Sequence, residues 1–573
     1  MDAETKNQLD FPVVGRTAAN TPAMPQRPLR PALLAPYRDL TTLRYDFPLV
    51  LVTAATPDGA VQSLTGIVNA LLKELAPRGA SGEKMRRHLL RLEQEIRRRV
   101  AAGKGGRLGA VWDDVATALC ALDAEIGQSL SPARAALAVD GELADCAADT
   151  PRRVVSHLWR IACAQKRAAV VARIDALKAA LSDLLAAGTL SEARAARIRT
   201  VLEHLVPPAF FADGADPAPI ADDCAAARKT CRAQRAALVD LARAIAVGEL
   251  ERDGRYDPAL HDAAIAGWSD ASLGAEALAL APGVLLCLDD TGAALRGEVL
   301  DLLAAGLPVK ILVTSDDLLG APDADPPLGL SAAKLGTMAA GLEDAFVLQA
   351  SAAALVRTAT RIGRGLAYDG PALVAVFTGR PAAAADGLPL YLQAAAAGQA
   401  RLFPTFCYDP SAGPELVARW SVADDNPQAE RDWSVHPFVY ENGGQRVATD
   451  LAFTPADLIA CDPRFSDHVR LVAAAGWSDA MAPVDAVLNE AAGADAVPFV
   501  PVVDATDRLF RAIPSKAVIA ASARCRDAWH ALQEMGGIGN SWADKKVAEE
   551  KEIWDEERQM LVLAAKAHET AAS

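Results

Sequence analysis

The chain has 573 residues, of which 51% are hydrophobic and 23% are charged, and its formal net charge is −15. This much apolar sequence can fill several cores, so a disordered chain is excluded. The negative charge argues against general nucleic-acid binding, because contacts with phosphates need a basic surface.

Neither a membrane span nor a secretory signal is expected. No apolar run approaches the roughly 20 residues that cross a bilayer, and the start, Met1 to Glu4, is acidic and polar, unlike a signal peptide. The nine cysteines include no Cys-x-x-Cys pair of the kind that zinc ribbons and iron–sulfur clusters use. An odd number of cysteines fits a reducing compartment, so we expect a cytoplasmic protein.

The first 45 residues are rich in proline and are predicted to form an extended arm, 1–45. Proline lacks a backbone donor and cannot continue a helix. The arm also contains apolar side chains (Phe11, Leu33, Leu34, Tyr37), which favour docking onto another surface over a free tail.

The next region, 46–250, is predicted to be a mainly helical domain. A strand is expected at 47–54, before the turn residues Pro57-Asp58-Gly59. Apolar residues then recur every three or four positions, which is the spacing of amphipathic helices. The predicted helices cover 63–76, 84–101, 109–126, 152–187, 191–205 and 223–249.

Basic residues are concentrated on the helix predicted at 84–101. One interpretation is an ordinary solvated face, and the other is a surface that docks an acidic partner such as a small electron carrier. Docking would use Arg86, Arg87, Arg91, Arg97 and Arg98.

In 251–427, short apolar runs alternate with helical stretches. Strands are predicted at 284–288, 309–313, 345–348, 372–377 and 402–408, and helices at 293–305, 332–341, 352–365 and 389–397. This alternation is typical of βαβ units, in which helices cover both faces of a parallel sheet. The predicted fold class is therefore α/β, with a parallel-sheet domain preceded by a large all-helical region.

Residues 428–540 are predicted to be a mixed α/β region, and 541–573 a charged C-terminal helix with Trp554 and Leu561 on one side. In the mixed region, 499–503 and 509–512 can pair as a hairpin. Pro501 would confine the first of these strands to the edge of a sheet, because it cannot donate to a neighbour.

Acidic residues follow the first two strands of the α/β domain. Asp289, Asp290 and Thr291 come after the first strand, and Asp316 and Asp317 after the second. Ligands of parallel sheets bind outside the carboxyl ends of the strands, so these residues are candidates for a cofactor site. Asp290 and Asp317 could hold Mg²⁺, which prefers oxygen ligands. Alternatively, the acids cap the helices that follow.

Five segments carry a resemblance to a known family: LCLDD (286–290), GLPVKILV (306–313), AFVLQAS (345–351), YDGPALV (368–374) and FPTFCYDP (403–410). Their order and spacing over about 283–427 resemble the thiamine-diphosphate domain of the 2-oxoacid:ferredoxin oxidoreductases, pyruvate:ferredoxin oxidoreductase in particular. The resemblance implies a thiamine-diphosphate-binding fold. It also implies that Asp290 stands at the family's Mg²⁺-binding aspartate and Asp316 or Asp317 at its asparagine.

The chain departs from the family at this motif, because Asp289 and Thr291 flank Asp290 where the family has glycines. Those glycines let the backbone approach the diphosphate, and added acids repel it. We therefore expect a degenerate domain that keeps the fold and binds neither thiamine diphosphate nor Mg²⁺. The family's cluster-binding cysteines also have no counterpart here, so clusters would belong to partner chains.

The first functional hypothesis is a non-catalytic or atypical subunit, a pseudoenzyme, of a multi-subunit redox enzyme related to 2-oxoacid:ferredoxin oxidoreductase. It would support assembly or partner docking, with iron–sulfur proteins or ferredoxin as partners. One alternative is a scaffold without chemistry, since a fold does not fix a function. The other is an enzyme that binds a metal and a phosphorylated ligand through Asp290 and Asp317.

Overall fold

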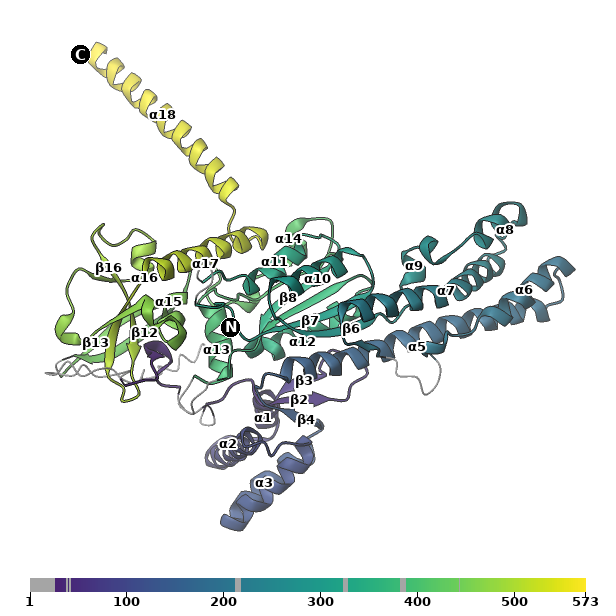
Figure 1. Cartoon of the computed structure of the whole chain (residues 1–573), viewed down its shortest axis with the longest axis horizontal. Coiled ribbons are helices and arrows are strands. Elements are labelled where there is room, and N and C mark those ends of the chain that lie inside the picture. The colour runs from purple at the N-terminus through teal and green to yellow at the C-terminus, as the bar shows by residue number, and fades with distance from the viewer. Residues whose placement is uncertain are drawn as a thin grey trace.

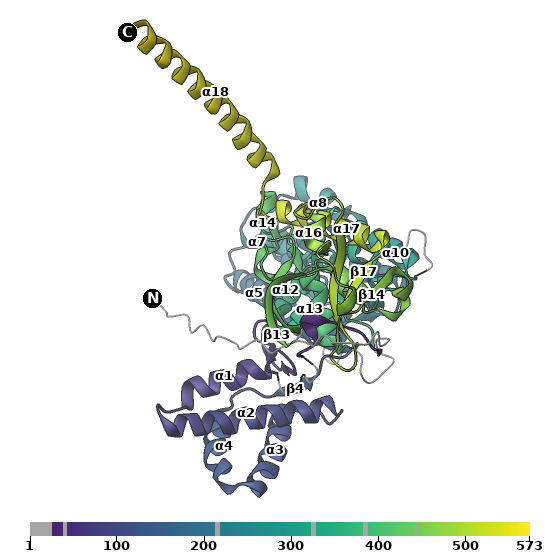
Figure 2. The same ribbon diagram turned by 90° about the vertical axis from the view of Figure 1, so that its left-hand side faces the viewer.

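The computed structural model describes residues 26–37, 40, 43–211, 218–322, 328–381, 388–442 and 444–572. A seven-stranded sheet lies in the middle of the molecule. An N-terminal helical bundle, a long helical arm and a C-terminal α/β region surround this sheet, and the last helix projects away from it (Figures 1 and 2). The protein is thus a mixed α/β protein.

The central sheet has the strand order β11-β10-β8-β9-β7-β6-β5. Neighbouring strands from β5 to β8 are parallel, whereas β10 and β11 are antiparallel to their neighbours. The strands are β5 (Ile220–Ala221), β6 (Val284–Asp289), β7 (Val309–Ser315), β8 (Phe346–Ser351), β9 (Ala372–Phe377), β10 (Phe406–Tyr408) and β11 (Trp420–Ser421).

Four of the five predicted strands are confirmed as members of a parallel sheet. The exception is the strand predicted at 402–408, which is limited to β10 and runs antiparallel to β8. An apolar run has the same residue pattern in either direction, so the sequence does not encode this difference. β5 was not predicted, because it is a two-residue strand inside the region assigned to helices.

Helices cover both faces of the sheet, and successive residues of a strand pack against opposite sets of helices. One face is covered by α5 (Thr150–Ala186), α12 (Leu355–Ala367) and α13 (Leu390–Gln399), and the other by α7 (Cys224–Arg252), α10 (Ala293–Ala304) and α11 (Leu335–Ala340). Leu285 and Leu312 share a core with the first set of helices, and Leu286 and Ile311 share a core with the second. Burial on both faces explains why these strands read as continuous apolar runs.

The N-terminal region is not all-helical. A three-stranded antiparallel sheet, β2 (Leu49–Val52), β3 (Val61–Ser63) and β4 (Gly141–Ala144), packs with α1 (Leu64–Leu75), α2 (Ala80–Ala101), α3 (Leu108–Leu122) and α4 (Ala124–Ala136). The strand predicted at 47–54 is confirmed as β2. β4 was missed because it begins with Gly141, and glycine is unfavourable in strands. Here glycine is required, because a Cβ at this position would lie 2.3 Å from the carbonyl oxygen of Leu51.

The long helices of the predicted helical domain do not form a separate unit. The N-terminal half of α5 packs on the central sheet, and its C-terminal half forms an arm with α6 (Glu192–His204) and α7 (Figure 1). Near the C-terminal end of α7, the buried Glu251 binds Arg194 and Arg197, each at 2.7 Å. Two short helices, α8 (Pro258–Ala266) and α9 (Ala275–Leu278), lead from the arm back to β6.

The C-terminal region contains a hairpin of β12 (Ser434–Asn442) and β13 (Gln445–Phe453) beside a second sheet. This sheet has the order β1-β16-β17-β14, with β15 parallel to β16. Its strands are β1 (Arg30–Pro31), β14 (Val469–Val472), β15 (Met481–Pro483), β16 (Val497–Val503) and β17 (Leu509–Pro514), and the helices of the region are α14 (Leu416–Arg419), α15 (Pro455–Ile459), α16 (Val484–Leu488) and α17 (Lys516–Met535).

The predicted hairpin of 499–503 and 509–512 is confirmed, with Val503 opposite Leu509. The prediction that Pro501 confines its strand to an edge is wrong, because β16 has partners on both sides. β15 pairs only as far as Phe499, and β1 starts at Val502. Pro501 therefore falls between two short partners, at a position where no backbone donor is needed.

The described part of the proline-rich arm is docked on the C-terminal sheet. Arg30 pairs with Val503, and Leu33 and Leu34 pack against the core of that region. Phe11 lies outside the described residues. The charged C-terminal helix is confirmed as α18 (Ser541–Ala572). Within the described ranges, no helix has the length and apolar character needed to cross a membrane.

Asp504, which is fully buried, connects the arm to the hairpin turn. Its carboxylate accepts hydrogen bonds from the backbone N–H groups of Gln26 (3.2 Å) and Thr506 (2.9 Å) and from Nε of Arg508 (2.8 Å). Burial opposes the charge, but the hydrogen bonds from Arg508 and Thr506 outweigh it and lower the pKa of Asp504 to about 2.

We predict that Asp504→Ala releases the arm. Loss of hydrogen bonds to a charged group costs about 1.5–3 kcal/mol, which corresponds to at least about tenfold faster amide exchange. Hydrogen–deuterium exchange of peptides from 26–37 measures this effect. Asp479→Ala, an exposed aspartate of the same region, is the control and should leave these peptides unchanged. Equal exchange in the two variants would refute the assigned role of Asp504.

Candidate functional site

Asp290 directly follows β6. It lies at the edge of the central sheet that the carboxyl ends of the parallel strands form, and its side chain there is almost fully buried. Its two carboxylate oxygens lie 2.7 and 2.8 Å from Nη1 of Arg296 on α10. They also accept hydrogen bonds from the N–H of Gly292 (3.0 Å) and from Oγ of Ser315 (3.1 Å) at the end of β7. The carboxylate of Asp290 is therefore paired with a cation and joins the ends of two neighbouring strands.

Three of the five residues that were predicted to form a cofactor site are exposed, namely Asp289, Thr291 and Asp316. Asp289 accepts a hydrogen bond from Oγ1 of Thr314 at 2.5 Å and lies 3.6 Å from the guanidinium of Arg152 on α5. The capping alternative is not confirmed for Asp290. The N-cap of α10 is Gly292, and no side chain caps this helix; the carboxylate of Asp290 binds the N–H of Gly292 itself, before the first turn.

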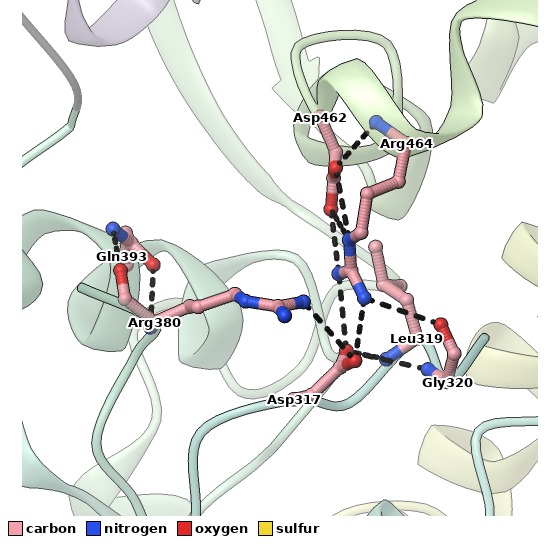
Figure 3. Close-up of polar contacts among 7 residues, drawn as sticks. All are labelled: Asp317, Leu319, Gly320, Arg380, Gln393, Asp462 and Arg464. Atoms are coloured by element: carbon pink, nitrogen blue, oxygen red, sulfur yellow. Dashed lines mark hydrogen bonds and ion pairs between the residues drawn. The ribbon is translucent and has the colours of Figure 1, made fainter. Parts of the chain in front are cut away.

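Asp317, after β7, forms the centre of a second cluster at the same edge (Figure 3). Its oxygens accept hydrogen bonds from Nη1 and Nη2 of Arg464 at 2.5 and 3.1 Å, and from the N–H groups of Leu319 (3.0 Å) and Gly320 (3.3 Å). Burial alone would raise the pKa of Asp317. The hydrogen bonds and charge of Arg464 outweigh that effect and hold the pKa below its usual value.

Arg464 comes from the C-terminal region, in the 3-10 helix Pro463–His468, and it binds a second carboxylate there. Its guanidinium lies 2.7–3.1 Å from the oxygens of Asp462. Burial disfavours the charge of Arg464, but the hydrogen bonds that it donates to Asp317 and Asp462 raise its pKa above the ordinary value. A permanently charged guanidinium therefore bridges the central sheet and the C-terminal region.

Arg380 completes the cluster from the end of β9. Gln393 on α13 holds its backbone, with 2.9 Å hydrogen bonds to both the N–H and the carbonyl of Arg380. The guanidinium of Arg380 is 53% exposed and lies 3.6 Å from Asp317, so it makes a looser contact than Arg464 (Figure 3). The side chain is thus directed toward Asp317 by its backbone and is only weakly held.

Sequence reasoning missed Arg380, Asp462 and Arg464. The rule that selected the acidic residues, namely position after a parallel strand, would also have selected Arg380. No local signal points to Arg464, because it stands 147 positions after Asp317 in a different region. Only the packing of the C-terminal region against the sheet brings the two together.

The residues at this edge do not fit Mg²⁺. The ion needs oxygen ligands with free lone pairs, whereas Asp290 and Asp317 each accept four or more hydrogen bonds or ion pairs, including an arginine in both cases. A cation would have to displace these guanidinium groups. The part of the chain that the structure describes also contains no cluster of three or more His, Cys, Asp or Glu side chains able to hold a metal ion.

The predicted docking arginines separate into two groups. Arg86, Arg87, Arg91 and Arg98 are exposed on α2. Arg97 is buried, donates to the carbonyl of Phe47 at 3.1 Å and pairs with the buried Glu93. Its assignment to the docking surface is therefore corrected. The sequence does not distinguish Arg97 from the neighbouring exposed arginines, so it could not predict that this side chain faces the core.

Comparison of the sequence with models of known protein families finds no match, and comparison with curated proteins finds none either.

We predict that Arg464→Ala lowers the stability of the junction between the central sheet and the C-terminal region. Leaving Asp317 and Asp462 without their cation costs about 1–3 kcal/mol, and for a chain of 573 residues that unfolds as one unit each kcal/mol lowers Tm by roughly 1 °C. Arg380→Ala is the matched control, because a half-exposed ion pair contributes only about 0–1 kcal/mol. Thermal unfolding measures both variants, and equal Tm shifts would contradict the role given to Arg464.

The pH dependence of this difference follows from Asp317. Its pKa in the folded state lies below the unfolded value of about 3.9, so the stabilisation by Arg464 is present above about pH 4 and is lost as the pH falls further. The Tm difference between the wild type and Arg464→Ala should therefore shrink between about pH 4 and pH 3. A constant difference over this range would show that Asp317 is not the group that Arg464 stabilises.

Proposed function

We propose that the chain is a non-catalytic subunit of a multi-subunit redox enzyme related to the 2-oxoacid:ferredoxin oxidoreductases. The observation that carries the proposal is the pairing of Asp317 with Arg464 at the edge of the sheet where a cofactor would bind. An internal guanidinium takes the role of the positive charge that Mg²⁺ would supply to that carboxylate. The domain then serves as a rigid structural module.

The proposal includes an evolutionary relationship between the central α/β domain and thiamine-diphosphate domains. It is supported by the order of the five resembling segments over 283–427 and by the position of the acidic turns at the carboxyl ends of β6 and β7. Asp290 follows the first strand, as the Mg²⁺-binding aspartate of the family does. Its ion pair with Arg296 is an argument that this carboxylate no longer binds Mg²⁺.

A role in partner docking is supported by α18, which projects away from the rest of the molecule (Figures 1 and 2). An isolated helix in water has little intrinsic stability, and apolar side chains on its surface favour association. Trp554 is 70% exposed and Leu561 71% exposed, seven positions apart on one side of the helix. The exposed arginines of α2 offer a second surface for an acidic partner.

The partners that we propose are iron–sulfur subunits or ferredoxin, because the cysteines of this chain show no cluster-binding arrangement among its described residues. The proposed compartment is the cytoplasm. A scaffold role in a complex without redox chemistry is the second candidate, and it is favoured by the same exposed face of α18. An enzyme using Asp290 and Asp317 for a metal has less support, because arginines hold both carboxylates.

We predict that purified protein shows no saturable binding of thiamine diphosphate in Mg²⁺ buffer by isothermal titration calorimetry. The native, untagged complex should also lack this cofactor at one copy per chain, as measured by mass spectrometry. The double variant Asp290→Asn, Asp317→Asn should leave the activity of the assembled complex unchanged within about twofold. Stoichiometric thiamine diphosphate in the native protein would overturn the proposal.

We further predict that Trp554→Asp releases the partner subunits, because a charge placed in an apolar contact is expensive to bury. Gln559→Asp is the matched control, since five positions further along α18 the side chain lies on a different face. Size-exclusion chromatography of native complexes measures retention, with absorbance of iron–sulfur clusters as the readout. A released partner without a cluster would support the scaffold function, and retention by both variants would contradict docking through Trp554.

A further inference from the structure

The C-terminal region contains a cavity that is separate from the edge of the central sheet. It has a volume of about 430 Å³, which lies within the usual range of small-molecule sites. Its walls come from the hairpin β12–β13 on one side and from β15, β16 and β17 on the other. In the hairpin, Thr449 lies directly opposite Phe438, and Val447 opposite Tyr440. Ala448 and Thr449 are exposed, so they mark the opening to solvent.

Aromatic rings form an almost continuous wall of this cavity. The rings of Phe438 and Tyr440 are stacked with centroids 5.4 Å apart, and Trp477 meets Tyr440 edge-on at 6.1 Å. Phe499 adds a further ring from β16. Such walls favour flat π-systems, which gain contact area and ring–ring interactions from stacking.

Arg511 of β17 is the one charged side chain that lines the cavity among the described residues. The carbon at the centre of its guanidinium lies 4.4 Å from the ring centroid of Trp477 and 4.1 Å from that of Phe499. The two rings therefore cover the guanidinium, and the N–H groups at its rim provide the polar contacts. A guanidinium that is held in this way keeps its planar fork of donors in a fixed orientation.

No carboxylate of the described chain forms an ion pair with Arg511. Burial lowers the pKa of Arg511, and the hydroxyl of Tyr440 is the group that favours its charged form. Arg511 is partly buried, and the groups around its guanidinium are the two rings and the hydroxyl of Tyr440. A charge that is partly removed from water is stabilised by a counter-ion, so an anion in the cavity would find a favourable partner in Arg511.

We infer that this cavity binds a small, planar aromatic carboxylate, with its ring against the aromatic wall and its carboxylate on the rim of Arg511. Carboxylates match the paired donors of a guanidinium. The cavity offers a single cation, so one negative charge balances it, whereas a phosphate dianion would leave charge uncompensated. The inference concerns a different part of the molecule from the proposed subunit function and does not depend on it.

The test uses the full chain and two probes of equal shape, 2-naphthoate and the uncharged 2-naphthamide. Isothermal titration calorimetry should show at least about tenfold tighter binding of the carboxylate to the wild type. Arg511→Met should reduce that ratio to about twofold or less while binding of the amide persists. Arg232→Met, at an exposed position on α7, removes the same charge elsewhere and should leave the ratio unchanged.

Arg511→Lys tests the geometry and also guards against misfolding of the methionine variant. It keeps the charge but loses the planar fork, so the ratio should fall to between the wild-type and methionine values. Circular dichroism confirms that each variant is folded. Equal affinity of the wild type for the two probes, absence of binding of both at millimolar concentration, or an unchanged ratio in folded Arg511→Met or Arg511→Lys would each overturn the inference.

Discussion

Arg464 adds a charged link to the apolar core that the central sheet and the C-terminal region share, because its one guanidinium serves two carboxylates from regions that are far apart in the sequence. Asp462 lies next to Arg464 and orients it, and Asp317 belongs to the loop after β7. Each carboxylate alone would be unfavourable at a partly buried edge. The bridge compensates both carboxylates and lies beside the apolar core through which the C-terminal region packs against the carboxyl end of the central sheet.

The same electrostatic arrangement recurs along this edge. Asp290 is satisfied by Arg296, from the helix that immediately follows it, so its compensation is local. Asp317 depends on a distant arginine, so its compensation requires tertiary packing. In both cases, the parallel strands collect loop carboxylates at one end of the sheet, and the chain itself provides the cations that a bound metal could otherwise supply. An edge built in this way favours rigidity over exchange of ligands.

The strands of the central sheet were predictable where burial on both faces requires a run of mainly apolar residues. The strands β6, β7, β8 and β9 are predominantly apolar. Short pieces such as β4 and β5 were not predictable, because their pairing depends on close approach at Gly141 or on two residues at the rim of the sheet. The acidic half of the candidate site followed from its position after strands. Of its basic residues, Arg380 also follows a strand, whereas Arg464 required knowledge of which distant segment packs against this end of the sheet. Arg97 shows that a basic side chain can be internal even within a run of exposed ones.

The pairing of β1 with β16 has a consequence for how the protein is made. Val503 follows its partner Arg30 by 473 positions (503 − 30), and synthesis of that stretch takes tens of seconds at usual rates. During that interval the arm must stay accessible without pairing to a wrong strand. Its prolines lack backbone donors, which makes the arm a poor partner for other open sheet edges. The sheet of the C-terminal region is thus completed by a segment that is synthesised much earlier, and β1 can take its place only after β16 has been translated.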